Sequence, residues 1–410
     1  MLLYFIIIVP ALFGIFLLFS YWQEVKYRRK PYYKLADVGW KTTEFPPESE
    51  KVYSVAMVGD AGAILTDGSD PVLNLLEKWQ QQNQQNSTAI FLGDNIYPVG
   101  LPEESSIHFV TAKTRLDCLL QTLQKYKTNS IFLSGNHDWN KGRSGGYQQV
   151  LRQENYIVNE LQHENSFLPR KGCPGPVTLQ LAHNLLLVVI NTQWWVHRSE
   201  KPLGEAYNCP YTDSEQFYVE LRKILNQNRH QRIIVAAHHP LYSNAVHGGK
   251  FTVKQHIFPL TAANKRFLVP LPILGSMYPF YRKYFGAYED MSHGKYKKMR
   301  KRLLRIFHQF SNIVYVAGHD HNLQHFEIRQ NHYIISGSGS KTSFVKKGGK
   351  ATFSLESLGF CVFNYYKNGE LWMEVHAENK TMEDNNAHIV FRKKLGSTIN
   401  MENPQPTAQL

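Results

Sequence analysis

The 410-residue sequence is poor in cysteine, with only four, and acidic residues are fewer than basic ones. So few cysteines exclude a fold held together by a framework of disulfides. The 46 Lys and Arg against 33 Asp and Glu give a formal net charge of +13, which favours anionic partners such as phosphorylated substrates, nucleic acid or anionic lipid. Hydrophobic residues make up 43% of the chain, enough for a large core, so a mostly disordered protein is excluded.

Charge is missing altogether from Leu2 to Trp22, and the first charged side chain is Glu24. A segment of this length matches the roughly 20 residues that a bilayer-spanning helix needs, so we predict a retained single-pass membrane anchor at residues 2–22. A cleaved signal peptide is the main alternative, but no basic residue precedes the run and bulky residues follow it. A buried soluble helix is a third interpretation. Basic residues at 26–34 would keep the following chain in the cytoplasm, although the side of the membrane stays open.

Short apolar segments, each ending abruptly in polar residues, dominate the next part of the chain. Strands that are apolar throughout are typical of α/β sheets buried on both faces. We predict five such strands at 52–58, 89–92, 131–133, 233–237 and 313–317. Helices are expected between the first three, at 71–83 and 111–126, and further strands at 185–190 and 333–335. Two last strands, 359–365 and 371–375, flank an Asn368-Gly369 turn that predicts a hairpin.

The five strand ends carry carboxylate, amide and imidazole side chains. In α/β sheets, ligands bind at the carboxyl ends of the strands, so these side chains would converge if the strands are neighbours. Oxygen and nitrogen ligands together suit Fe, Mn or Zn, and the lack of accompanying Cys argues against a structural zinc site. Six residues are too many for one open site and suit two ions roughly 3.5–4 Å apart. The six are Asp60, Asp94, Asn136, His238, His319 and His321.

Five motifs in this order resemble those of the calcineurin-like metallophosphoesterases. They are Gly59-Asp60-Ala61-Gly62, Gly93-Asp94-Asn95-Ile96-Tyr97, Gly135-Asn136-His137-Asp138, Val235-Ala236-Ala237-His238 and Gly318-His319-Asp320-His321. Tyr97, three residues after Asp94, narrows the resemblance to the purple acid phosphatase branch, and 318–324 looks like the tartrate-resistant group. The resemblance covers residues 52–250 and 310–380. It implies an α/β (α+β) fold, a four-layer sandwich of two mixed β-sheets flanked by helices.

The same resemblance implies a role for each residue. Two metal ions would serve as cofactors, Fe(III) and a divalent Fe, Zn or Mn, and they would lower the pKa of a bound water so that hydroxide forms at mild pH. Asp60, Tyr97 and His321 resemble the ligands of Fe(III), Asn136, His238 and His319 those of the divalent ion, and Asp94 the bridge between them. His137 resembles the proton donor to the leaving oxygen, His247 a second His on the substrate side, and Asn95 and Asp320 residues that orient ligands.

Some neighbouring residues have simpler interpretations. His239 follows a ligand candidate and is expected to face away from the site. Cys118 and Cys361 are expected in the core. Cys173 and Cys209 could form a disulfide if the domain is extracytoplasmic, a point that the sequence leaves open because it gives no distance.

Residues 250–310 form an insert that lies outside the resemblance. The part at 267–280 is apolar, uncharged and broken by Pro, and 295–305 carries seven basic residues in eleven positions. Such a pair is attracted to a bilayer surface; the alternative is a lid over the catalytic domain beside a solvated basic helix. The predicted organisation is an anchor at 1–22, a juxtamembrane linker at 23–50, a catalytic domain at 51–395 and a polar tail at 396–410.

The function expected from the resemblance is that of a membrane-anchored, acid phosphatase-like enzyme. It would hydrolyse phosphate monoesters through attack by metal-bound hydroxide. Alternatives are a phosphodiesterase acting on nucleotides or lipids with the same site, and a catalytically silent membrane adapter, which the complete set of seven ligand candidates disfavours. Nucleic acid is not an expected partner, because the sequence has no recognisable aromatic–basic binding module. The natural substrate and the oligomeric state stay open.

Overall fold

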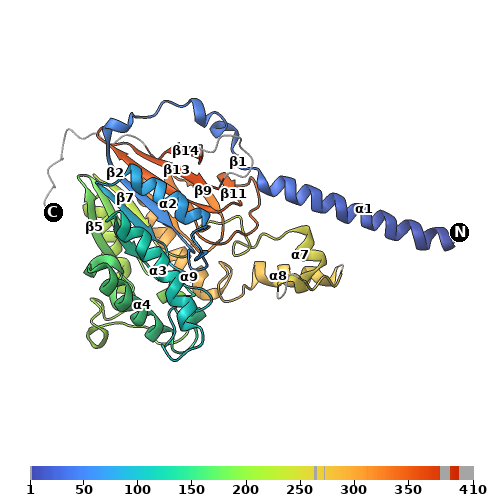
Figure 1. The fold of residues 1–410 in the computed structure, drawn as a ribbon, viewed down its shortest axis with the longest axis horizontal. Helices are drawn as coiled ribbons and strands as arrows, with labels where there is room; N and C mark the ends of the chain where they lie inside the picture. Colours follow the sequence, from blue (N-terminus) through green and yellow to red (C-terminus); the bar gives the residue numbers. More distant parts are fainter. Residues whose placement is uncertain (1, 263–265, 272, 312, 379–387, 397–410) are drawn as a thin grey trace.

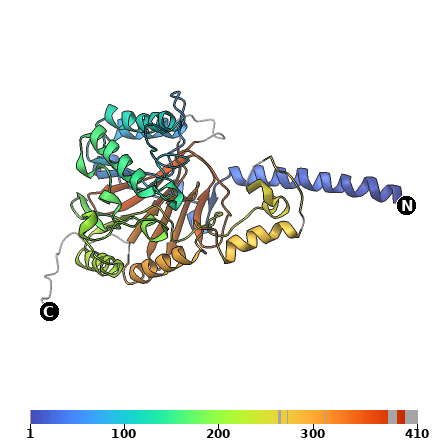
Figure 2. The ribbon, with the colours of Figure 1, turned by 90° about the horizontal axis from the view of Figure 1, so that it is seen from below.

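Two β-sheets form the centre of the protein and pack face to face, with helices on their outer faces (Figures 1 and 2). The structure, a computed structural model, describes residues 2–262, 266–271, 273–311, 313–378 and 388–396. One sheet has eight strands in the order β1-β11-β9-β10-β8-β7-β6-β5, and the other has six in the order β14-β13-β12-β2-β3-β4. The predicted two-sheet α/β architecture is therefore confirmed.

The strand bounds agree with most of the apolar segments in the sequence. The eight-stranded sheet contains β1 (Tyr32–Tyr33), β5 (Val177–Ala182), β6 (Leu185–Val189), β7 (Arg232–Ala236), β8 (Ile313–Ala317), β9 (Leu323–Ile328), β10 (Asn331–Ser336) and β11 (Ala351–Leu355). The six-stranded sheet contains β2 (Lys51–Val58), β3 (Ser87–Phe91), β4 (Asn129–Phe132), β12 (Gly359–Tyr366), β13 (Leu371–Ala377) and β14 (Ile389–Lys394). Strands β2, β3 and β4 run parallel, as do β6, β7, β8 and β10. The predicted hairpin is β12–β13.

Helices cover both outer faces because each carries one apolar stripe. The six-stranded sheet is covered by α2 (Pro71–Gln82), α3 (Phe109–Lys125) and α4 (Gly146–Leu161), and the eight-stranded sheet by α6 (Ser214–Gln227) and α9 (Gly294–Phe307). In α2, Val72, Leu75, Leu76 and Trp79 are buried at helical spacing. Asp70 caps this helix, because its side chain accepts hydrogen bonds from the backbone amides of Val72 and Leu73. The cap determines the residue at which α2 begins.

The N-terminal segment differs from its prediction. Helix α1 (Leu2–Arg29) continues without a break past Trp22 into the charged stretch that begins at Glu24, and it projects from the body of the molecule (Figure 1). Among the described residues, no helix combines the length and the apolar character that crossing a membrane requires. This finding contradicts the predicted transmembrane anchor at 2–22 and, with it, the single-pass membrane localisation.

The predicted linker at 23–50 is tied to the rest of the protein. Arg28 forms an ion pair with Glu356, and β1 pairs with β11. Cys173 and Cys209, which the sequence left open, form a disulfide with their Cα atoms 5.6 Å apart. Cys361 is buried as predicted, whereas Cys118 is only half-buried. Of the predicted tail, residues 397–410 lie outside the described residues.

The predicted insert divides into two different parts. Its basic segment is helix α9, whose side chains Tyr296, Met299, Leu303 and Phe307 are buried against the eight-stranded sheet. The preceding residues form α7 (Val253–Ile257) and α8 (Met277–Tyr284), which lie on the same side of the body as α1 in both views (Figures 1 and 2). Many apolar side chains of this second part are exposed, among them Phe267, Ile273, Leu274, Met277 and Phe280. Helix α9 is therefore an amphipathic helix that packs its apolar side chains on the core. Attraction of 267–280 and 295–305 to a bilayer surface stays a prediction.

Candidate metal centre

The strand ends that carry the predicted ligands meet at one edge of the two sheets. Asp60, Asp94 and Asn136 follow β2, β3 and β4 of the six-stranded sheet, and His238, His319 and His321 follow β7 and β8 of the eight-stranded sheet. Backbone hydrogen bonds join the loops, from Asp60 N to Gly93 O at 3.0 Å and from Gly318 N to His238 O at 3.0 Å. The strands are therefore not neighbours in one sheet; the site lies where two sheets abut.

The backbone at this edge is strained and tightly packed. Asp60, Asp94 and His319 have φ values of 60°, 56° and 71°, which non-glycine residues rarely adopt and which cluster at functional sites. A Cβ atom at Gly135 would lie 2.3 Å from Asp94 Oδ1 and 2.6 Å from His238 Cε1. Glycine is required there because any side chain would collide with two of the converging residues.

Three of the predicted ligands form a first group of convergent atoms. Asn136 Oδ1 lies 2.9 Å from His238 Nε2 and 3.0 Å from His319 Nδ1, and the two imidazole nitrogens are 3.2 Å apart. The opposite nitrogen of each ring is fixed, since His238 Nδ1 donates to Leu92 O and His319 Nε2 donates to Glu289 O, both at 2.9 Å. The lone pairs of His238 Nε2 and His319 Nδ1 therefore face the same point as the amide oxygen.

A second group surrounds the phenol of Tyr97. Its oxygen lies 3.0 Å from Asp60 Oδ1, 3.1 Å from Asp94 Oδ2 and 3.1 Å from His321 Nε2. The other oxygen of Asp94, Oδ1, lies 3.6 Å from His238 Nε2 in the first group. Asp94 thus extends from one group to the other, and all seven predicted ligands come together.

The residues present fit two metal ions. Asp60 and Asp94 are buried carboxylates, and a charge removed from water needs a partner of opposite sign. Ligand atoms of Asp60, Asp94 and His238 lie within 4.8 Å of one another. Such a mixture of carboxylate, phenol, amide and imidazole suits Fe, Mn or Zn.

The protonation states of two ligands follow from this environment. Burial raises the pKa of Asp94, but the facing imidazoles of His238 and His137 more than offset it and hold the pKa at about 2, so Asp94 is a carboxylate. Burial and the carboxylates of Asp60 and Asp94 raise the pKa of Tyr97 well above its ordinary value. Tyr97 therefore needs a cation to become a phenolate.

Two further histidines line the accessible side of these groups. His137 Nδ1 donates to Pro98 O at 2.6 Å, which leaves Nε2 toward the site, 3.8 Å from Asp94 Oδ2. The ring of His247 lies 4.3 Å from that of His319, centroid to centroid. Side chains of both are partly exposed, His137 at 16% and His247 at 21%. Both side chains are therefore accessible from outside, and their predicted roles toward a substrate stay predictions.

The two residues predicted to orient ligands are both hydrogen-bonded beside the site, and the backbone amide of Asn95 donates to Asp138 Oδ1 at 3.0 Å. Asn95 Nδ2 donates to Leu133 O at 2.7 Å, and Asp320 Oδ2 accepts from Ser243 Oγ at 2.6 Å. Asp138 itself was missed as a supporting residue, although it belongs to the third motif. Its carboxyl group accepts from the backbone amides of Gly135 and Asp94, both at 2.8 Å, and so ties two ligand loops together.

His239 was expected to face away, and the structure only partly agrees. Its Nδ1 pairs with Thr192 Oγ1 at 3.0 Å. Yet its ring lies 4.6 Å from that of His319, and the ligand atoms of His238, His239 and His319 lie within 4.8 Å of one another. Burial and the neighbouring His238 lower the pKa of His239 well below its ordinary value, so its ring is neutral beside the first group.

The sequence also missed residues that come from outside the motifs. Glu289, from the insert, accepts a hydrogen bond from Asn136 Nδ2, and the adjacent Asp290 pairs with His247. The ammonium group of Lys341 lies 3.2 Å from the centre of the Tyr97 ring. No motif marks these positions, because tertiary packing alone brings them to the site.

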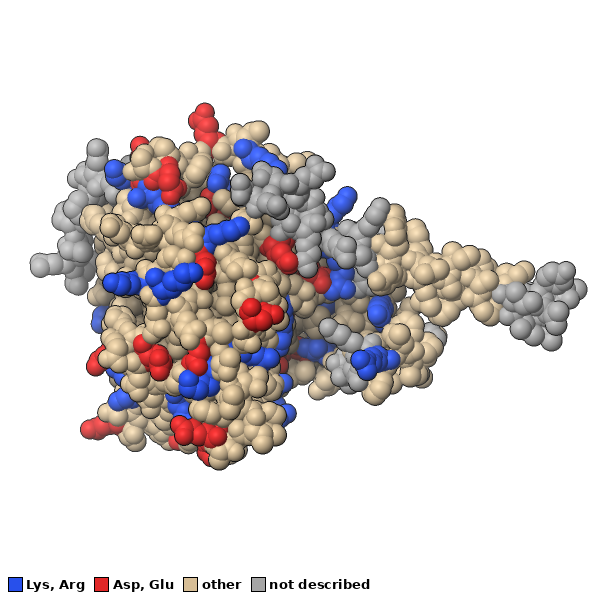
Figure 3. All heavy atoms as spheres, viewed as in Figure 1, with Lys and Arg blue, Asp and Glu red and all other residues tan. Residues whose placement is uncertain are grey.

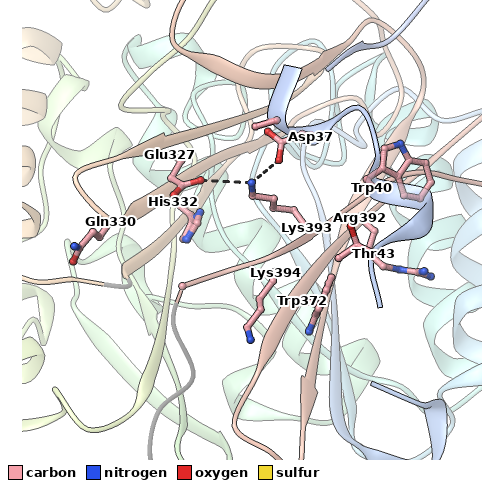
Figure 4. A pocket seen from close by; sticks show the side chains of 12 residues that line it. Asp37, Trp40, Thr43, Glu327, Gln330, His332, Trp372, Arg392, Lys393 and Lys394 are labelled. Atoms are coloured by element: carbon pink, nitrogen blue, oxygen red, sulfur yellow. Dashed lines mark hydrogen bonds and ion pairs between the residues drawn. The ribbon is translucent and has the colours of Figure 1, made fainter. Parts of the chain in front are cut away.

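A separate cavity of about 550 Å³ lies at the opposite end of the strands (Figure 4). Trp40, Trp372 and His332 help to line it, at the end of β9 and β10 that is remote from Asp320 and Gly337. Its cations are held by acidic partners, Lys393 by Asp37 and Arg392 by Glu374. On the face seen in Figure 3, Lys and Arg are likewise interspersed with Asp and Glu. The convergent strand-end residues are therefore the stronger candidate for a catalytic site.

Comparisons with known proteins identify the family of the chain through a family model. A search of curated proteins finds no match. Similar solved structures include GAP50, the anchor in the inner membrane complex of Plasmodium, with 16% identity, a TM-score of 0.47 and coverage of 84% of this chain and 88% of that one. Another is PhoD, with 10% identity, a TM-score of 0.49 and coverage of 85% and 72%. The family model for calcineurin-like phosphoesterases matches residues 53–323, a segment that contains all seven converging residues. The chain therefore belongs to the calcineurin-like phosphoesterase family.

Proposed function

We propose that the protein is a dinuclear metal-dependent phosphoesterase that hydrolyses phosphate monoesters, as an acid phosphatase does. The observation that carries the proposal is the pair of convergent ligand groups joined by Asp94. Two bound cations would polarise the phosphoryl oxygens and lower the pKa of a bound water. The two groups differ in chemistry: phenol and carboxylates surround one point, and an amide with two imidazoles surrounds the other. This difference favours Fe(III) in the Tyr97 group and a divalent Fe, Zn or Mn in the Asn136 group.

The protein's own residues supply the remaining functions. His137 Nε2 faces the site from its accessible side, where it can give a proton to the leaving oxygen. His247 and Lys341 lie on either side of the ligand groups, where each can meet a terminal phosphoryl oxygen. A monoester offers more charged terminal oxygens than a diester, so the additional cation of Lys341 favours monoesters over the alternative, a phosphodiester of nucleotides or lipids.

The test combines metal analysis with two model substrates. We expect about two metal ions per chain and a higher kcat/KM on 4-nitrophenyl phosphate than on bis(4-nitrophenyl) phosphate. The reverse preference would favour the phosphodiesterase. Two bound ions without turnover of either substrate would favour a catalytically silent protein and overturn the proposal. Contact between the exposed apolar residues of 267–280 and a lipid surface stays a prediction that this experiment does not address.

A further inference from the structure

The insert reaches the candidate metal centre through one residue that makes two contacts. Glu289 Oε1 accepts a hydrogen bond from Asn136 Nδ2 at 2.9 Å, and the backbone oxygen of Glu289 accepts from His319 Nε2, also at 2.9 Å. Asn136 and His319 both belong to the group of three convergent atoms. A single residue of the insert therefore holds two members of that group.

The side-chain contact decides which end of the Asn136 amide faces the other ligands. An amide presents an oxygen acceptor at one end and an NH₂ donor at the other. With Nδ2 donating to the Glu289 carboxylate, Oδ1 points at His238 Nε2 and His319 Nδ1. The opposite orientation would direct N–H bonds at a cation, so the carboxylate favours the only orientation in which Asn136 can ligate.

The backbone contact acts on His319 in the same way. Because His319 Nε2 carries the proton that it donates to Glu289 O, its Nδ1 keeps a lone pair. The peptide is held in place from both sides: the Asp290 carboxylate accepts from Ala287 N at 2.8 Å and from Arg282 Nε at 2.7 Å, and Met291 N donates to His247 O at 3.0 Å. Asp290 is fully buried. The position of Glu289 therefore depends on the packing of the insert and not on a strand end.

We propose that Glu289 is a positioning residue for the divalent-ion site, which orients Asn136 through its side chain and His319 through its backbone. The proposal rests on the proposed function only in taking Asn136 and His319 as metal ligands. It makes the insert a structural part of the metal centre. Outer hydrogen-bond partners of this kind typically change metal affinity about 10- to 100-fold when removed.

The test measures metal affinity rather than activity. Metal-free protein is titrated with Zn²⁺ against a chelating dye, for the wild type and for Glu289→Ala, Glu289→Leu and Glu289→Gln. We expect one of the two bound Zn²⁺ ions, the one in the Asn136 group, to bind about 10- to 100-fold less tightly to the Ala and Leu variants. Leu leaves little room for a water to replace the carboxylate. Gln retains an acceptor for Asn136 Nδ2, so Glu289→Gln should restore affinity close to that of the wild type.

Controls distinguish a variant that does not fold from a failure of the positioning role and from a failure of the proposed function. Glu205→Ala removes an exposed glutamate elsewhere and should bind both ions normally; thermal unfolding of the metal-free proteins checks that each variant is folded. The positioning role is overturned if Glu289→Ala and Glu289→Leu bind both ions as the wild type does. It is also overturned if Glu289→Gln is as weak as Glu289→Ala, since the carboxylate charge would then matter instead of the orientation. Wild-type protein that binds two ions but hydrolyses no phosphate ester would defeat the proposed function and leave this inference standing.

Discussion

The strand-end residues and the residues of the insert reach the same site by different routes. Asp60, Asp94 and Asn136 are placed by the ends of parallel strands and by glycines that allow close approach. Glu289 and Asp290 are placed by a segment whose own helices α7 and α8 lie largely outside the core. The first set provides ligand atoms, whereas the second set orients side chains that the first set supplies. We therefore expect changes at the strand ends to abolish function and changes in the insert to weaken it.

The largest effect is expected for Asp94→Ala, at a strand end. Asp94 faces both ligand groups, so its removal takes a ligand from each of two cations and leaves their mutual repulsion poorly screened. We expect loss of both metal ions and a fall in kcat of more than about 10⁴-fold, above the range for loss of a general acid, because both the activated water and the polarising cations are lost together. Metal analysis measures the loss of the ions, and turnover of 4-nitrophenyl phosphate measures the fall in kcat. A variant that retains two ions and near-normal turnover would refute the bridging role.

A substrate-dependent effect is expected for His137→Ala. Proton donation matters most when the leaving oxygen is a poor leaving group, and general acids typically contribute about 10²- to 10⁴-fold. We expect an alkyl phosphate to be slowed by that amount, whereas 4-nitrophenyl phosphate, which leaves readily without a proton, should be slowed far less. The ratio of kcat/KM on the two substrates is the measurement. Equal losses on both would show that His137 only supports the structure.

A spectroscopic effect is expected for Tyr97→Phe. If Fe(III) occupies the group around Tyr97, a phenolate on that ion absorbs visible light by charge transfer. We expect oxidised wild-type protein to be coloured and Tyr97→Phe to be colourless while both ions remain bound through Asp60, Asp94 and His321. Visible absorption and iron content are measured together. Colourless wild-type protein with stoichiometric iron would exclude Tyr97 as a ligand.

The contrast between the two regions also explains what the sequence could predict. Four of the five strand ends combine an apolar run, a glycine and a ligand, and the end of β7 combines an apolar run with a ligand. Local rules therefore place Asp60, Asp94, Asn136, His238 and His319 without knowledge of the whole fold. Such local rules could not predict which residues from elsewhere in the chain contact these ligands. Glu289 meets Asn136 across 153 positions of sequence, and Lys341 meets Tyr97 only because the loop after β10 folds back over the site.

The same limit accounts for one error and one alternative that stayed open. Composition predicted a membrane anchor at residues 2–22, and it left 295–305 either as a segment attracted to a bilayer surface or as a solvated basic helix. In the fold, α1 runs on into charged residues, and α9 buries Tyr296, Met299 and Leu303 beneath the basic side chains. Long basic side chains on a core helix keep their charges at the surface while the apolar stripe packs inward. Counting charges along the chain cannot distinguish that arrangement from a free basic segment.

The smallest effect on activity is expected for Asp290→Asn in the insert. The buried Asp290 carboxylate binds Arg282 and His247, and Asn keeps an acceptor for one of them but loses the charge that balances the guanidinium. Breaking a buried ion pair on one side costs about 3–5 kcal/mol. Because α7 and α8 have few buried contacts of their own, we expect this cost to loosen residues 250–293 before the sheets unfold. Limited trypsin digestion should then cleave after the exposed Lys254 and Lys283 faster than in the wild type. Activity should fall through KM more than through kcat, since His247 is mispositioned while the strand-end ligands stay in place.

Arg282→Ala is the matched variant, which removes the other half of the pair. Unchanged digestion in both variants would show that the Asp290–Arg282 pair does not hold the insert in place. Loss of metal as complete as in Asp94→Ala would show that the insert matters for metal binding as much as the strand ends do.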